Sequence, residues 1–215
     1  ELARHLKGGR MAEAKHAQES ALLISMLLSL PAATALAVLA VPVISVLFER
    51  GAFDTIATLA TADALIAFAW GLPAFVLIKV FQPGFFARED TLTPTVLAGV
   101  SVVINIAISL ALFPALEHVG IAIATSVSAW INTLMLASLL WRRGHFRLEG
   151  REIRRHGLIL AAALLMAALV WGLSLALAPW LAPQSGLFGK ALALAILVGA
   201  GLLVYFGLIH LTGVQ

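Results

Sequence analysis

The sequence predicts an all-α fold, a bundle of helices that crosses a membrane several times. Of its 215 residues, 61% are hydrophobic and only 12% are charged, and the mean hydropathy is +1.02. The core of one soluble domain cannot bury that much apolar surface. Six apolar stretches are long enough for a crossing, which takes about 20 residues. A β-barrel would show short segments of alternating hydrophobicity instead, so we expect six transmembrane helices.

The six expected spans are residues 21–48, 64–87, 95–116, 119–141, 157–180 and 191–209. The connectors 1–20, 88–94 and 142–156 hold eleven lysines and arginines, whereas the alternate connectors hold only Arg50 and Lys190. By the positive-inside rule, both ends of the chain are expected on the cytoplasmic side. This arrangement explains the net charge of +3 without nucleic acid as a partner.

The composition also predicts a division of the chain. Residues 1–20 are expected to form a cytoplasmic linker or amphipathic segment, and residues 21–141 a group of four spans. Residues 142–156 are expected to form a basic cytoplasmic linker before the two terminal spans in 157–215. The start at Glu1 and the absence of a signal peptide suggest a piece of a longer protein.

Prolines interrupt the first two spans. Proline lacks the N–H that bonds the carbonyl four residues earlier, so we expect kinks at Pro31 and Pro42 and helix breaks at Pro73 and at Pro83-Gly84. Broken membrane helices usually face protein or a water-filled cavity, although such breaks also occur in purely structural helices. In the turn "FERGAFD", residues 48–54, Gly51 is expected to take a positive φ.

Polar residues recur in the third and fourth spans. Asn105 and Ser109 lie four residues apart and therefore share one helical face. Such residues commonly hydrogen-bond neighbouring membrane helices, and they could also supply oxygen ligands to a cation. The spacing favours the first interpretation. The polar set is Ser101, Asn105, Ser109, Thr125, Ser126, Ser128 and Asn132.

Lys79 is the one charge well inside an expected span. It precedes Arg88 by nine residues, which is about 13 Å along a helix. Its side chain could snorkel toward the interface, but an intramembrane cation is by default a functional candidate. The sequence has no cysteine, and its six histidines lack metal-ligand spacing. No residues are predicted to be catalytic, and an enzyme is disfavoured.

Three motifs together resemble the MurJ (MviN) family of lipid II flippases in the MOP exporter superfamily. They are "LFERGAFDT" at 47–55, "GLPAFVLIKVFQPGFFAREDTLTP" at 71–94 and "HVGIAIATSVSAWINTLML" at 118–136. The resemblance implies a fourteen-span transporter of which this chain supplies spans nine to fourteen, with a groove for the lipid tail in the last two. It implies as partners lipid II or a related polyprenyl-linked glycan, membrane lipids and the N-terminal portion of the same protein.

The resemblance also implies site residues. Lys79, Arg88 and Asp90 match the family's cavity signature, together with Pro83, Thr93 and Pro94. No cofactor is implied except a possible sodium ion, with Asn105, Thr125 and the backbone of Ile121 as ligands, while Ser109 replaces an aspartate of the family pattern. The implied function is lipid II flipping by alternating access in the bacterial inner membrane. The alternatives are export of another polyprenyl-linked glycan or a small cation, and a non-transporting envelope scaffold.

Overall fold

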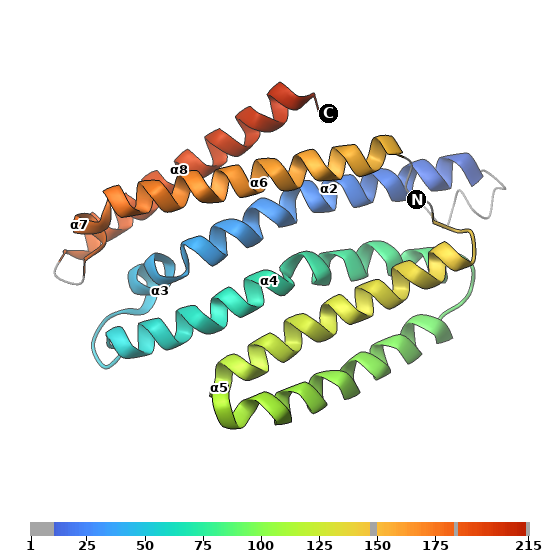
Figure 1. The fold of residues 1–215 in the computed structure, drawn as a ribbon, viewed down its shortest axis with the longest axis horizontal. Coiled ribbons are helices and arrows are strands. Elements are labelled where there is room, and N and C mark those ends of the chain that lie inside the picture. Colours follow the sequence, from blue (N-terminus) through green and yellow to red (C-terminus); the bar gives the residue numbers. More distant parts are fainter. Residues whose placement is uncertain (1–10, 147–149, 183–184, 214–215) are drawn as a thin grey trace. The chain divides into compact units, whose positions relative to one another are not determined.

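The structure, a computed structural model, describes residues 11–146, 150–182 and 185–213. Within these ranges the regular structure is helical, which confirms the all-α class. Five helices are long and apolar enough to cross a membrane: α2 (Met11–Val38), α4 (Thr55–Phe86), α5 (Leu92–Arg142), α6 (Gly150–Ala176) and α8 (Leu187–Thr212) (Figure 1). Two short helices, α3 (Ala40–Phe48) and α7 (Ala178–Leu181), lie in the connections.

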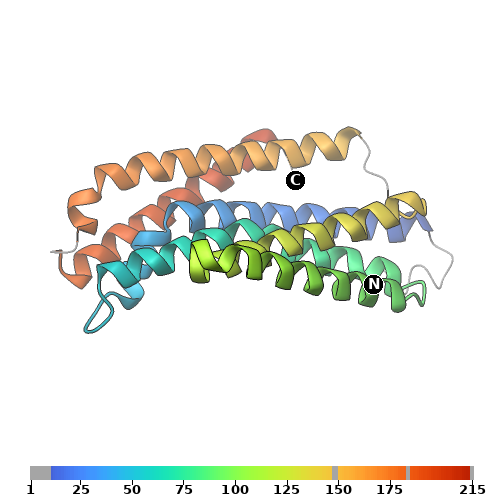
Figure 2. The same ribbon diagram turned by 60° about the horizontal axis from the view of Figure 1, so that its bottom comes forward.

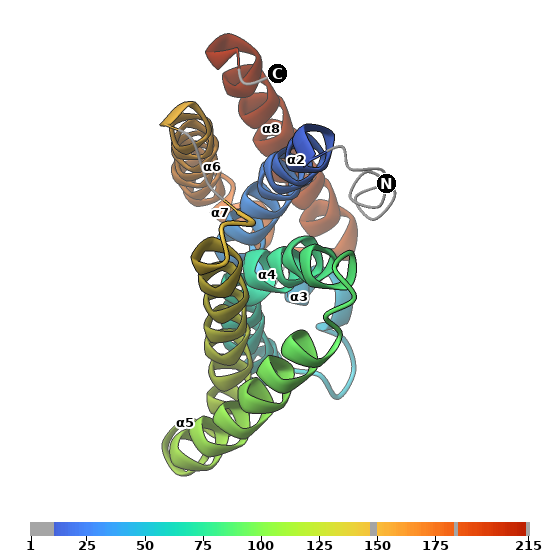
Figure 3. The same ribbon diagram turned by 90° about the vertical axis from the view of Figure 1, so that its right-hand side faces the viewer.

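Helix α5 is a hairpin of two arms. At Glu117 the backbone leaves the helical region, with φ 48° and ψ −127°, and the chain reverses. The two arms, 92–116 and 118–142, lie next to each other near this turn and diverge away from it, as Figures 1 and 3 show. The 51 residues of α5 therefore account for the third and fourth expected spans, with the turn where the sequence predicts it.

Of the expected helix interruptions, only the one near Pro42 separates two helices in the structure. The first span breaks at Leu39, which separates α2 from α3 and places Pro42 in the first turn of α3, where its missing N–H costs little. In contrast, α2 continues as a helix through Pro31, and α4 continues through Pro73 and through Pro83-Gly84. The prediction of breaks at Pro73 and at Pro83-Gly84 is wrong, because membrane helices tolerate proline where neighbouring groups satisfy the freed carbonyl. The kink expected at Pro31 stays a prediction.

Two expected connectors are partly helical. Helix α2 begins at Met11, inside the expected linker 1–20, and α6 begins at Gly150, inside the expected basic linker 142–156. The remaining linker residues 1–10 and 147–149 lie outside the described residues. In the turn after α3, Gly51 has φ 60°, which confirms the expected positive φ.

The chain divides into two compact units, each treated by itself below. Unit 1 contains residues 1–29 and 71–156, and unit 2 contains residues 30–70 and 157–215. The sequence instead predicted one group of four spans, 21–141, separate from the terminal spans. The difference arises because α3, within the first expected span, packs against α8 at the end of the chain.

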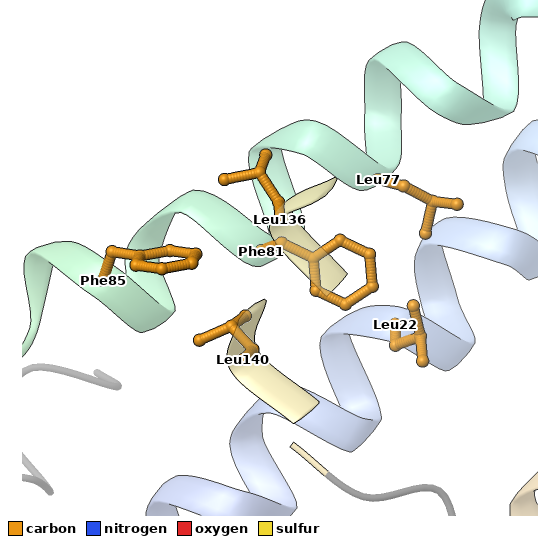
Figure 4. Packing of buried hydrophobic residues seen from close by; sticks show 6 residues of the cluster. All are labelled: Leu22, Leu77, Phe81, Phe85, Leu136 and Leu140. Atoms are coloured by element: carbon orange, nitrogen blue, oxygen red, sulfur yellow. The ribbon is translucent and has the colours of Figure 1, made fainter. Parts of the chain in front are cut away.

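In unit 1, apolar residues from three helices form the core. Leu22 of α2 packs with residues of α4 and of the second arm of α5, as Figure 4 shows. Spacings of four residues within each helix place these side chains on one face. Near Gly71 the helices approach so closely that a Cβ would lie 2.9 Å from the Cα of Ser126. The buried core residues are Leu22, Leu77, Phe81, Phe85, Leu136 and Leu140.

In unit 2, α7 turns the chain between α6 and α8 (Figure 2). A Cβ on Gly201 of α8 would lie 3.1 Å from a methyl group of Val170 of α6, so these two helices also pack closely. A second buried cluster joins Ala40 and Ile44 of α3 to Ala62 of α4. The helices of unit 2 are thus held by close apolar contacts.

Candidate functional site

Lys79 lies on an exposed face of α4. Its position is in the second half of the helix, seven residues before the last helical residue, Phe86. The side chain is exposed and makes no ion pair or hydrogen bond within the described part of the chain. Lys79 therefore presents a cation, without a partner in the described part of the chain, on the surface of a membrane-spanning helix of unit 1.

Arg88, the second residue of the expected cavity set, caps the end of α4. Its Nη1 donates a hydrogen bond to the carbonyl of Gly84 at 2.6 Å. The last carbonyls of a helix lack intrahelical donors, so a guanidinium is a suitable partner there. Partial burial lowers the pKa of Arg88 from its usual value, although an arginine stays charged. In this structure Arg88 therefore stabilises the C-terminal end of α4.

Asp90, the third residue of that set, organises the connection between α4 and α5. Its Oδ1 accepts a hydrogen bond from the Thr93 amide at 2.9 Å, and its Oδ2 accepts one from the Thr93 hydroxyl at 2.7 Å. Arg143, just after α5, donates to the same Oδ2 at 2.6 Å. The Arg143 and Thr93 hydrogen bonds lower the pKa of Asp90 to about 2.

Arg143 is a residue that sequence reasoning did not single out. Its Nη2 also donates to the Thr93 hydroxyl at 3.2 Å, and its guanidinium lies 5.5 Å from the centroid of the Phe85 ring. A neighbouring histidine, His145, has a buried Nδ1 without a partner among the described residues, and burial together with Arg88 and Arg143 lowers its pKa. In sequence, Arg143 is one arginine among the many in a basic segment, so no pattern distinguishes it.

A polar seam joins the two arms of α5. Asn105 Nδ2 donates to the Thr125 hydroxyl at 3.2 Å and to the Ser128 hydroxyl at 3.3 Å. Thr125 Oγ1 in turn donates to the Ile121 carbonyl at 2.8 Å, and Ser101 Oγ donates to the Ser128 carbonyl at 2.8 Å. These bonds connect the arms across the hairpin, as the interhelical interpretation of the sequence predicts.

The same seam partly fits a cation. The oxygens of Thr125 and Ile121 lie together beside the Asn105 amide, and the Ser109 hydroxyl, one turn away, is buried without a hydrogen-bond partner in the described part of the chain. These are neutral hard oxygens, which suit an alkali cation. No carboxylate is among them, and the Asn105 amide presents its NH2 group to Thr125. Among the described residues there is no cluster of three His, Cys, Asp or Glu for a metal ion.

A second charged cluster, also unforeseen, lies in unit 2. Lys190 of α8 donates to Glu49, just after α3, with an Nζ–Oε2 distance of 2.9 Å. Glu49 belongs to the quoted motif "LFERGAFDT", but the sequence offers no signal that links it to a lysine 141 residues later. Only the packing of α3 against α8 brings the two together.

The helices and the polar residues between them define the class of protein: the chain is part of a multi-pass α-helical membrane protein. It belongs to the family described as lipid II flippase MurJ, whose model matches residues 1–203. The chain is 44% identical over 211 residues to the "Probable lipid II flippase MurJ" of Rhizobium meliloti (strain 1021), covering 96% of this chain and 38% of that protein.

Two further similarities agree with this family. The chain is 41% identical to the "Probable lipid II flippase MurJ" of Rhizobium tropici, over 99% of this chain and 40% of that protein. Its fold matches a solved structure of a "Lipid II flippase MurJ, inward closed conformation" with a TM-score of 0.79 and 23% identity, over 98% of this chain and 41% of the other. The chain thus spans about two fifths of the length of these relatives.

Proposed function

We propose that the protein to which this chain belongs flips lipid II, the undecaprenyl-pyrophosphate-linked peptidoglycan precursor, across the bacterial inner membrane. Transport proceeds by alternating access and needs no covalent step. Both ends of this chain lie on the cytoplasmic side in this proposal, which follows the excess of lysine and arginine in connectors 1–20, 88–94 and 142–156. The family membership and the names of the relatives support this function.

One observation within the chain carries the proposal: Lys79 is an exposed cation on a membrane-spanning helix, without a partner among the described residues. An unpaired ammonium group in hydrocarbon is costly, so it is retained where it meets water or an anion. The pyrophosphate of a lipid-linked precursor is such an anion. We place Lys79 in the substrate cavity, with its other walls supplied by the rest of the protein.

Arg88 and Asp90 have a supporting role in this proposal. Their contacts, with the Gly84 carbonyl and with Arg143 and Thr93, hold the end of α4 and the start of α5. They position the helix that carries Lys79. Lys79 alone of the expected cavity set is then available to the substrate.

The experiment replaces Lys79 in the full-length protein. Lys79→Ala is expected to lower the rate of lipid II flipping about tenfold or more at normal expression, because a positive charge near the pyrophosphate is lost. Lys79→Arg keeps the charge and is expected to retain part of the activity. The readouts are growth of cells depleted of their own flippase and lipid II translocation in vesicles.

Arg151→Ala is the matched control, because it removes an exposed positive charge from the start of α6 and is expected to leave flipping unchanged. Wild-type flipping by Lys79→Ala would remove Lys79 from the substrate path. Failure of the wild-type protein itself to support growth would favour another polyprenyl-linked glycan, a small cation or a scaffold role.

We also propose a sodium ion as the one cofactor of these spans, held by oxygens of Asn105, Thr125 and Ile121 with the Ser109 hydroxyl nearby. Binding would require the Asn105 amide to turn its oxygen inward. Since no carboxylate contributes, the affinity is expected to be weak. Sodium should then raise the melting temperature of the purified full-length protein more than potassium does, and Asn105→Ala should abolish that difference. Equal melting temperatures in both salts for the wild type would exclude the site.

A further inference from the structure

The inference concerns the buried ion pair of unit 2. Glu49 follows the last residue of α3, and Lys190 lies in the first turn of α8. The side chains are only 14% and 8% exposed, and the Nζ–Oε2 distance is 2.9 Å. Lys190 is therefore buried and Glu49 nearly so, and the two charges give up most of their contact with water for one contact between segments distant in sequence. Such a contact is costly to form and more costly to break.

Hydrogen bonds complete this pair. Ser45 Oγ donates to Glu49 Oε2 and accepts from Lys190 Nζ at 3.0 Å. The other carboxylate oxygen, Oε1, accepts from the Thr55 hydroxyl at 2.9 Å. Each oxygen of Glu49 thus has a donor, and these bonds lower the pKa of Glu49 to about 2, with Ser45 and Lys190 as the main causes. A fully bonded carboxylate remains charged at physiological pH.

The backbone on both sides of the pair is also fixed. Arg50 donates from Nη2 to the carbonyls of Val46 and Leu47, which caps the last turn of α3. On the other side, the Lys190 amide donates to the Gly186 carbonyl at 3.2 Å at the start of α8. The positive end of the α8 dipole disfavours an ammonium there unless an anion neutralises it, so Lys190 depends on Glu49.

We infer that Glu49 and Lys190 form a permanent joint that fixes the start of α8 to the end of α3 and stays closed while the protein works. The reason is energetic. Separating the pair would leave an uncompensated carboxylate and ammonium in a buried site, and a cycle that required this step would be slowed by about 10²-fold or more. The two residues are positioning residues, and movements of the transport cycle occur elsewhere. The statement about transport rests on the proposed function.

The experiment uses a cross-link. The chain contains no cysteine, so a full-length version with any other cysteines replaced can carry Glu49→Cys and Lys190→Cys together. A short bifunctional methanethiosulfonate then links the two thiols, and a reductant releases them. We expect the unlinked double variant to flip lipid II about tenfold more slowly than the wild type, and the linked protein to recover most of the rate. The matched control places the cysteines at Glu152 and Arg155, an ion pair within α6 that joins no two segments, where the unlinked loss should be smaller.

Two results would overturn the inference. If linking the two introduced thiols stops flipping and the reductant restores it, the joint must open during transport. If the unlinked double variant flips at the wild-type rate, the joint has no positioning role. Hydrogen exchange gives a readout that does not depend on flipping: Lys190→Met should raise exchange at the first hydrogen-bonded amides of α8, from residue 190 onward, at least tenfold, while Lys190→Arg should raise it less. Unchanged exchange in Lys190→Met would reject the joint even if the protein transports a different substrate.

Discussion

The two units hold their helix ends with ion pairs that differ in burial. In unit 2, Lys190 and Glu49 are 8% and 14% exposed. In unit 1, Arg143 and Asp90 are 41% and 24% exposed, although their contact is shorter, at 2.6 Å. By distance alone, breaking the exposed pair would be expected to cost more stability. Burial reverses that order, because water can replace a broken exposed contact but cannot reach a buried one.

The two pairs also differ in the alternatives open to each partner. Arg143 is held by Asp90, by Thr93 and by the face of Phe85, so loss of one contact leaves the others. Lys190 has only Glu49 and Ser45 as hydrogen-bond partners within the described residues. The Asp90–Arg143 pair thus shares its contacts with a connection at the surface, whereas the contacts of the Glu49–Lys190 pair are concentrated at one buried point.

The largest expected effect follows from removing one buried charge. Lys190→Met should destabilise the full-length protein by about 3–5 kcal/mol, because Glu49 remains buried without its cation. The double variant Glu49→Leu/Lys190→Met should be close to wild type in stability, since it removes both charges and keeps similar volume. Chemical unfolding of the purified protein in detergent measures both. A double variant as unstable as Lys190→Met would mean that packing, and not charge, dominates at this point.

Acid titration sharpens the comparison. The folded pKa of Glu49 is lowered to about 2 from an ordinary value of 4.5, so its pairing stabilises the fold fully above about pH 4.5 and loses that effect as the pH falls toward 2. Between these values the difference in melting temperature between the wild type and Glu49→Gln should shrink steadily. If the difference stays constant from pH 6 down to about 2, the charge of Glu49 contributes nothing.

A smaller loss is expected at the exposed pair. Arg143→Lys keeps the charge but loses the planar fork that reaches both Asp90 and Thr93 and the stacking on Phe85. We expect a drop of only a few degrees in melting temperature, diminished further in high salt, which screens exposed charges. Asp90→Asn keeps a cap for the Thr93 amide and should behave similarly. A loss of stability as large as that of Lys190→Met would contradict the explanation that water compensates for a broken exposed ion pair.

The comparison also marks what the sequence can predict. The apolar stretches predict the helices, and the gap between the spans 95–116 and 119–141 predicts the turn at Glu117, because both depend on local composition. The predicted breaks at Pro73 and Pro83 are wrong, since helix continuity at these prolines depends on neighbours that a single segment does not contain. Helices α2 and α6 begin at Met11 and Gly150, before the expected apolar spans, because charged residues extend each helix on the N-terminal side of its apolar part.

The candidate sites show the same limit. Lys79 stands out in the sequence because one charge interrupts an apolar run, and Asn105 with Ser109 stands out through its spacing. Arg143 and Lys190 do not stand out, because the role of each depends on an ion pair with a residue distant in sequence. Arg143 pairs with Asp90, 53 residues earlier, and Lys190 pairs with Glu49. Tertiary packing decides which of many surface charges meets a partner. No local pattern contains that information.

The smallest expected effect concerns two helix ends that close in the same way. At the end of α5, the His145 amide bonds the Leu140 carbonyl and the Gly144 amide bonds the Trp141 carbonyl, with Gly144 at φ 71°. At the end of α4, Asp90 and Glu89 make the same two bonds, to Phe85 and Phe86, but the residue with positive φ is Glu89, at 63°. A side chain at this position is strained, and its negative charge lies at the unfavourable end of the helix dipole.

Glu89→Gly should therefore stabilise the protein by about 0.5 kcal/mol, because the relief of strain exceeds the added entropy of glycine in the unfolded chain. Gly144→Ala should cost about 1 kcal/mol by the reverse argument. Glu89→Ala separates the two causes, since it removes the charge and keeps the Cβ. If Glu89→Ala gains as much as Glu89→Gly in unfolding experiments, the dipole and not the backbone accounts for the effect. If neither variant is more stable than the wild type, the positive φ of residue 89 does not destabilise the protein. The contacts of the neighbouring Asp90 with Thr93 and Arg143 then hold the backbone in this conformation whatever side chain residue 89 carries.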